Sequence, residues 1–212
     1  MDQEARPTAE SSPERLVTFT DAVAAIAMTL LILPLLETIS DAAGEHDDLN
    51  TLVSEHLDEF AAFALSFAVI FRFWWAHHSL FRHVSALHPP LVAWSVVWTF
   101  AIVFLPIPTA IVMAFTTSAG TVALYGGALV LASGSLSMLA LYVYRHPEIS
   151  TGRSPATREG VLGSFSAFVA QILATVVGIV FWESISYWAY LLMFFTAPIE
   201  SLIRRRWDKL RA

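Results

Sequence analysis

The sequence predicts an all-α integral membrane protein with six transmembrane helices. Hydrophobic residues make up 56% of its 212 positions, and the mean hydropathy is +0.62, whereas soluble domains are about 45–50% apolar. Six segments are apolar over about 20 residues, the length that crosses a bilayer. They are 15–37, 57–82, 91–115, 119–144, 160–181 and 184–203. The positive charges between them fall on one side of the predicted membrane, which supports this fold class.

The first segment, RLVTFTDAVAAIAMTLLILPLLE, is apolar but carries Asp21 about six residues from Arg15. A carboxylate inside a membrane segment costs roughly 2.5–3.5 kcal/mol, so it needs a partner or a function. We expect Pro34 to lie near the end of this helix, where a kink or termination costs least. An acidic loop, DAAGEHDDLN at 41–50, follows.

The later segments carry their own signals. The second ends in aromatic and basic residues that include Trp74 and Trp75, as expected at a membrane boundary. His88-Pro89-Pro90 breaks the chain and starts the third, which contains two further prolines. The fourth is rich in glycine and serine, which permit close helix packing. A short turn near 182–184 separates the fifth from the sixth.

The distribution of Lys and Arg predicts the orientation. With both termini in the cytoplasm, the inside segments hold 11 of the 12 basic residues and the outside loops hold none. The 11 are Arg6, Arg15, Arg82, Arg145, Arg153, Arg158, Arg204, Arg205, Arg206, Lys209 and Arg211. The remaining one, Arg72, lies within the second segment, about eleven residues from its inner end.

Composition also narrows the class of protein. The net charge of −6 argues against a nucleic-acid partner, and the absence of cysteine excludes disulfides and thiolate metal sites. Residues 1–14 are polar, lack a signal-peptide pattern and are expected to form a disordered tail. We therefore expect one transmembrane domain over 15–207 and a basic tail over 208–212.

A polar cluster is predicted at the inner ends of the first two helices. Asp21 and His77 lie about six residues, or roughly 9 Å, from those ends and reach similar depth if the helices pack as antiparallel neighbours. Arg15, Thr20 and Trp75 would join them. The carboxylate is interpreted either as a structural tie between the helices or as a gating or proton-sensing point, because histidine titrates near neutral pH. Arg72 must pair or face water.

No enzyme or metal site is predicted. His77 and His78 are adjacent, so they cannot point at one metal on a helix. No Ser-His-Asp set, phosphate loop or nucleotide fingerprint can be placed. We expect no cofactor.

An apolar stripe follows the polar cluster on the first helix. Ile26, Leu30 and Leu33 recur at helical spacing, with Thr29 beside them. Such a stripe most often packs in a protein core. If the helix instead faces a symmetry axis, the same side chains form apolar rings that constrict a pore.

The motif Arg15-x-x-x-Phe19-Thr20-Asp21 resembles the Arg-x-x-x-Phe-Ser-Asp signature of the transmembrane protein 175 family of potassium channels, with threonine in place of serine. The following AVAAIAMTLLILPL, the FRFWWAHHSLF end of the second segment and the proline pair of the third agree with the bacterial members of the family.

This resemblance implies a homotetramer in the cell (plasma) membrane, with the first helices lining a pore for potassium ions. It implies a leak-type channel without the TVGYG filter, in which Ile26 forms the narrowest ring and Leu30 and Leu33 come next. Arg15, Phe19, Thr20 and Asp21 would hold the inner end, with weaker implied roles for His77 and a neighbouring Trp. The alternatives are an ion- or proton-coupled transporter using Asp21, Arg72 and His77, and a membrane assembly protein without transport.

Overall fold

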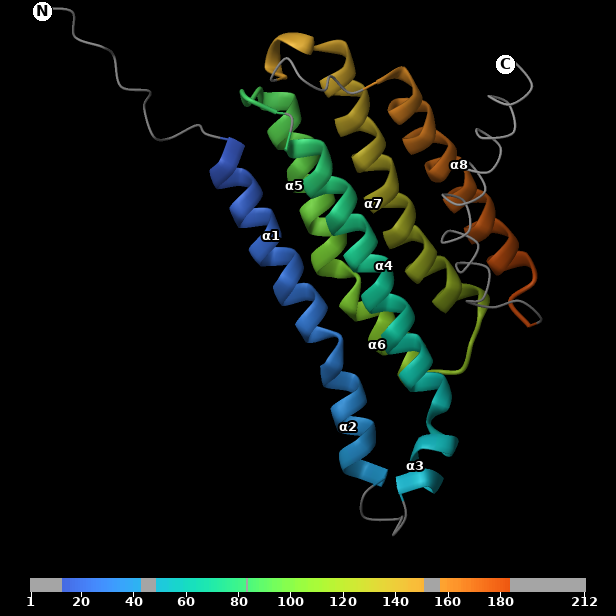
Figure 1. Cartoon of the computed structure of the whole chain (residues 1–212). Coiled ribbons are helices and arrows are strands. Elements are labelled where there is room, and N and C mark those ends of the chain that lie inside the picture. Colours follow the sequence, from blue (N-terminus) through green and yellow to red (C-terminus); the bar gives the residue numbers. More distant parts are fainter. Residues whose placement is uncertain (1–12, 43–48, 83, 151–156, 184–212) are drawn as a thin grey trace, which may run out of the picture.

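The computed structural model describes residues 13–42, 49–82, 84–150 and 157–183, and their regular elements are helices apart from one isolated β-bridge (Figure 1). Within these described residues, five apolar stretches are long enough to cross a membrane: Pro13–Asp41, Leu57–Phe81, Pro89–Ala114, Ala119–Arg145 and Arg158–Val180. The chain is therefore a multi-pass membrane protein. The sixth predicted segment, 184–203, lies outside the described residues.

The first span is broken into two helices, α1 (Pro13–Leu30) and α2 (Ile32–Ala42). Pro34 causes the break, because it has no N–H to donate to the carbonyl of Leu30 four residues earlier. Of the two outcomes expected near Pro34, a kink or termination, the structure shows an interruption and no termination. The chain resumes the helical conformation after Leu31 and stays helical to Ala42 (Figure 1).

Prolines also divide the third span, into α5 (Pro89–Phe104) and α6 (Pro106–Ala114). Pro106 cannot donate to the carbonyl of Ile102, and the backbone N–H of Leu105 donates to that carbonyl at 3.3 Å as well as to Ala101 at 3.2 Å. Neighbouring backbone thus satisfies the freed carbonyl. The second span is a single helix, α4 (Leu57–Phe81), preceded by a short helix that the sequence did not predict, α3 (Leu49–Glu55).

The central helix is α7 (Ala119–Arg145), which packs chiefly against α5 and α8 (Arg158–Val180). A capping box between Ser118 and Thr121 begins it. Its small residues bring α8 close, because a Cβ on Gly134 would lie 2.9 Å from the ring of Phe168. The hydroxyl of Ser137 also donates to the carbonyl of Ser164 across the interface at 3.0 Å.

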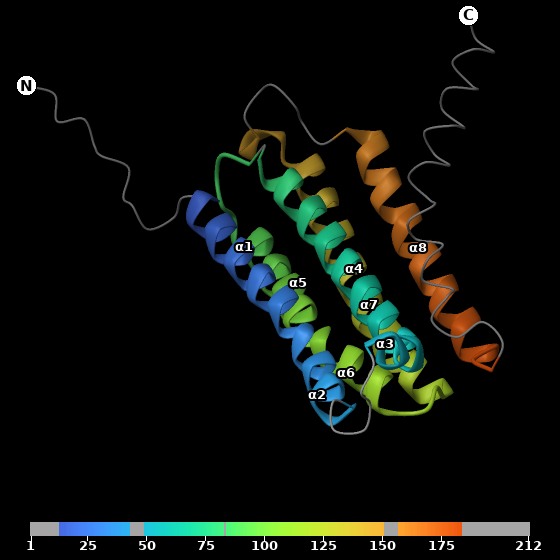
Figure 2. The ribbon, with the colours of Figure 1, turned by 60° about the horizontal axis from the view of Figure 1, so that its bottom comes forward.

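The two ends of the bundle differ in charge. The starts of α1, α5 and α8 and the ends of α4 and α7 share one end (Figures 1 and 2). The described arginines other than Arg72 lie there: Arg15, Arg82, Arg145 and Arg158. The opposite end carries carboxylates: Glu37, Asp41, Glu55, Asp58, Glu59 and Glu183. We call these the basic end and the acidic end.

Candidate functional site

Four large aliphatic side chains form an exposed line along the first span. Ile26, Leu30, Leu33 and Leu36 are 59%, 41%, 50% and 51% exposed. Their spacing of four, three and three residues places them on one side of the helix, and the line continues across the break at Leu31. We call these four residues the α1 stripe. Leu36 was missed at the sequence level, because the helix was expected to end beside it.

The opposite face of the span holds α1 against the bundle. Thr20, Ala24, Ala27, Leu31 and Leu35 are buried there, and α1 contacts α4 and α5. Small alanines let the helix backbones approach closely. Because this face packs inward, the α1 stripe must point away from the other described helices. The alternative that Ile26, Leu30 and Leu33 form the core is therefore wrong for a single chain.

The α1 stripe is long enough to make several successive constrictions. Seven residues separate Ile26 from Leu33, which is roughly 10.5 Å along a helix. Thr29 is also exposed, and its hydroxyl donates to the carbonyl of Ile26 at 2.7 Å. One hydroxyl oxygen per chain therefore accompanies an otherwise aliphatic line.

Asp21 ties α1 to α4 near the basic end. The indole Nε1–H of Trp74 donates to Asp21 Oδ1 at 2.8 Å. The Nδ1 of His78 lies 3.0 Å from Oδ2 and donates to it in the tautomer that carries a proton there. Both carboxylate oxygens are thus engaged, and the Asp21 side chain is 27% exposed. We call these three residues the Asp21 network.

The polar cluster predicted around Asp21 lies where it was expected, but two of its predicted members are wrong. Asp21 does meet the second span, but Trp74 and His78 contact it rather than Trp75 and His77. The residues that share one acceptor on a helix must be three or four apart. Trp74 and His78 satisfy this spacing and Trp75 and His77 do not, so the sequence carried a signal that could have identified the correct pair.

His77 instead faces the bundle interior. Its ring stacks on Trp98 of α5 with centroids 4.0 Å apart, and on Phe81 at 4.5 Å. The residue is fully buried, and its two nitrogens have no hydrogen-bond partner among the described residues. Trp75 points outward and is 53% exposed.

The remaining predicted residues lie on the same two helices as the Asp21 network. The hydroxyl of Thr20 donates to the carbonyls of Leu16 and Val17, both at 3.0 Å, so it caps local backbone rather than contacting Asp21. Phe19 is 60% exposed and Arg15 is exposed. Arg72 is half-buried on α4, two residues before Trp74.

Comparisons with known proteins match this part of the chain. The family model described as "Endosomal/lysosomal potassium channel TMEM175" matches residues 15–106, which include the α1 stripe and the Asp21 network. Residues 15–106, somewhat less than half of the chain, are similar to the TMEM175 family. The TMEM175 resemblance predicted from the Arg15–Asp21 motif is therefore confirmed over this segment.

Two relatives named as channels share sequence with the chain. A bovine (Bos taurus) protein called "Endosomal/lysosomal proton channel TMEM175" is 38% identical over 85 residues, which are 38% of this chain and 18% of the relative. A protein from Chamaesiphon minutus called "Potassium channel Cha6605_3372" is 32% identical over 105 residues, or 48% of this chain and 50% of the relative. The chain thus matches from less than a fifth to half of these relatives.

The fold similarity extends further than the TMEM175 sequence match. The crystal structure described as a lysosomal potassium-selective channel TMEM175 homolog from Chamaesiphon minutus aligns with 87% of this chain and 96% of that chain, with a TM-score of 0.57 and 22% sequence identity. At this identity the alignment supports the fold. The all-helical membrane architecture predicted from the sequence is confirmed.

Proposed function

We propose that the chain is a subunit of a homotetrameric, potassium-selective channel of the plasma membrane, with the α1 helices around its axis and both termini in the cytoplasm. The observation that carries the proposal is the α1 stripe, an aliphatic line that the described residues leave exposed within the segment that matches TMEM175. The matching family and the two relatives are all named as ion channels.

Several copies are required, because one stripe cannot enclose a pore. In a symmetric ring, each residue of the α1 stripe would repeat once per subunit and form an apolar collar. Ile26 would form the first and narrowest collar from the basic end, followed by Leu30 and Leu33. Water leaves a narrow aliphatic collar readily, so such collars gate by dewetting. K⁺ holds its hydration shell less tightly than Na⁺, which favours potassium where ions must shed water.

The Asp21 network would fix the inner end of α1 in this assembly. Its two bonds to α4 set the rotation of α1 about its own axis, which determines where Ile26 points. Arg15, Phe19 and Thr20 belong to the same helical turns, and Arg72 lies nearby on α4. A change in the network would therefore act on the pore through helix rotation rather than by contact with an ion.

Ion flux from liposomes tests the proposal. Wild-type protein should pass K⁺ faster than Na⁺, and Ile26→Asn should raise flux or weaken selectivity, because a polar ring holds water in the constriction. Leu173→Asn on α8 is the matched control, since Leu173 and Ile26 are both 59% exposed. If the two variants showed the same flux and selectivity, Ile26 would not line the pore.

Cross-linking tests the geometry independently of flux. The chain contains no cysteine, so a single Leu33→Cys variant reports only its own neighbours. If the α1 stripe surrounds an axis, this variant should form disulfide-linked dimers within a particle of four subunits. Leu173→Cys should stay monomeric under denaturing conditions. A monomeric particle would instead support the assembly-protein alternative.

A second candidate is proton permeation, because the bovine relative is named a proton channel. The same liposomes with a pH-sensitive dye and no potassium gradient measure it directly. The transporter alternative predicts saturable, gradient-coupled uptake that Asp21→Asn abolishes. Of the three residues that this alternative requires, His77 does not take part, because it packs against Trp98 and makes no hydrogen bond with Asp21.

A further inference from the structure

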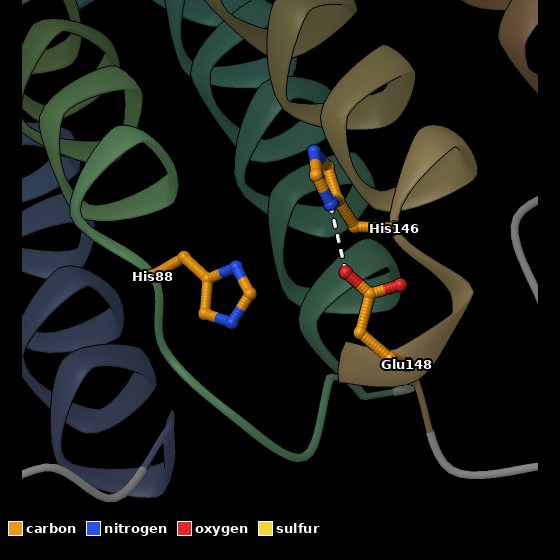
Figure 3. A group of neighbouring side chains, drawn as sticks. All are labelled: His88, His146 and Glu148. Atoms are coloured by element: carbon orange, nitrogen blue, oxygen red, sulfur yellow. Dashed lines mark hydrogen bonds and ion pairs between the residues drawn. The ribbon is translucent and has the colours of Figure 1, made fainter.

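A group of metal-type ligands lies at the basic end, away from the α1 stripe. His88 precedes α5, His146 follows α7, and Glu148 lies in the short 3-10 helix η1 (Pro147–Ile149) (Figure 3). One ligand atom from each residue lies within 4.8 Å of the others. His88 and His146 are 58 positions apart in the sequence, so spacing alone could not reveal this group.

We propose that His88, His146 and Glu148 bind a divalent transition-metal ion, with Zn²⁺ the best fit. Two imidazoles and one carboxylate suit borderline ions such as Zn²⁺, whereas Mg²⁺ and Ca²⁺ prefer oxygen ligands throughout. Three protein ligands leave a fourth tetrahedral position for water. The inference replaces the sequence-level expectation of no metal, and it does not depend on the proposed channel function.

The ligand spacing is close to that of a tetrahedral site. Zinc–ligand bonds of 2.0–2.2 Å place tetrahedral ligands about 3.3 Å apart. His146 Nδ1 and Glu148 Oε1 are 2.8 Å apart, so they would separate slightly as a bound ion replaced the proton between them. His88 would approach from the turn before α5, with the nitrogen that Tyr142 does not engage (Figure 3).

The surrounding backbone holds the two loops together before any metal binds. Ser85, in the turn before His88, donates from its backbone N–H and from its hydroxyl to the carbonyl of Ile149, at 2.7 and 3.0 Å. Val84 and Ser150 form a β-bridge beside them. The loops that carry His88 and Glu148 therefore stay adjacent, which lowers the entropy cost of assembling the ligands.

The ligands themselves are held in position. Each histidine precedes a proline, Pro89 or Pro147, which keeps its backbone out of the helical conformation. The hydroxyl of Tyr142 lies 3.1 Å from His88 Nδ1, and a hydrogen bond there would fix which nitrogen of His88 is free to bind a metal. The Tyr142 ring also stacks on His146 at 4.3 Å. One tyrosine thus orients both imidazoles.

The carboxylate is available to bind a cation. The Glu148 side chain is 59% exposed, which gives the ion a path from solvent. Metal bound here would tie the turn between α4 and α5 to the end of α7.

Metal titration of the purified full-length protein in detergent tests the proposal. After EDTA treatment, Co²⁺ should produce the visible absorption of a tetrahedral site with one ion per chain. Zn²⁺ should displace it and raise the thermal unfolding midpoint. His146→Gln and Glu148→Gln should each weaken affinity by about 100-fold. Tyr142→Phe should weaken it by about 10-fold, because it removes the hydrogen bond that orients His88.

His56→Gln is the matched control, because His56 forms a similar contact with Glu59, 3.3 Å apart, at the acidic end. It should bind both ions as the wild type does. Glu148→Gln keeps the test valid if a histidine variant fails to fold, since this exposed side chain supports no packing. Unchanged Zn²⁺ affinity in Glu148→Gln, or no cobalt absorption in the wild type, would overturn the proposal.

Discussion

Trp74 and Trp75 offer an unusually direct test of how α1 is anchored. They are adjacent on α4, yet only Trp74 donates a hydrogen bond to Asp21, at 2.8 Å, while Trp75 is 53% exposed. Replacing Trp74 by phenylalanine keeps an aromatic ring and removes the donor. Hydrogen bonds to charged groups contribute about 1.5–3 kcal/mol.

The expected loss is somewhat smaller than that range. The Asp21 side chain is 27% exposed and keeps its contact with His78, so water can replace part of the lost bond. We expect Trp74→Phe to lower the free energy of unfolding by about 1–2 kcal/mol. For a chain of this length that corresponds to a fall in unfolding midpoint of roughly 2–8 °C.

Far-UV circular dichroism of the detergent-solubilised protein measures the midpoint without relying on tryptophan fluorescence. Trp75→Phe is the control and should shift the midpoint little. In the Asp21→Asn background, Trp74→Phe should cost less than in the wild type, because the two residues then no longer share a charge-assisted bond. Equal shifts for Trp74→Phe and Trp75→Phe would refute the network.

Two further substitutions test the packing of the bundle by the same measurement. Gly134→Ala should lower the unfolding midpoint and cost about 1–3 kcal/mol of folding free energy, because its Cβ would press against Phe168 at 2.9 Å. Gly127→Ala is the control and should leave the midpoint unchanged, because a Cβ there meets nothing within 4 Å. His77→Phe should leave the midpoint unchanged or raise it, because it preserves the stack on Trp98 and removes two buried nitrogens without partners among the described residues. A large loss for His77→Phe would mean that the imidazole has a polar role.

The α1 stripe and the metal-ligand group occupy different parts of the molecule. The stripe runs from the middle of the first span toward the acidic end, and the ligands lie in loops at the basic end (Figures 1 and 3). Flux experiments and metal titrations therefore report on separate surfaces, and the failure of one proposal would leave the other standing.

Hydropathy and charge were sufficient to predict the membrane class and the five spans that the structure describes. Their lengths are set by bilayer thickness, which acts on each segment separately. The motif from Arg15 to Asp21 was enough to indicate the family, because it lies within one short helix. The periodicity of Ile26, Leu30 and Leu33 placed them on one face, which is a local property of any α-helix.

Tertiary structure decided which way each face points. Periodicity could not say whether the α1 stripe is buried or exposed; the packing of Ala24 and Ala27 against the bundle turned it outward. Contacts between spans likewise chose His78 over His77 as the partner of Asp21. The metal-ligand group depends on two loops 58 residues apart that meet only because α5 and α7 pack together. Local sequence fixes helices and their faces, whereas the neighbour of each face depends on how distant segments pack.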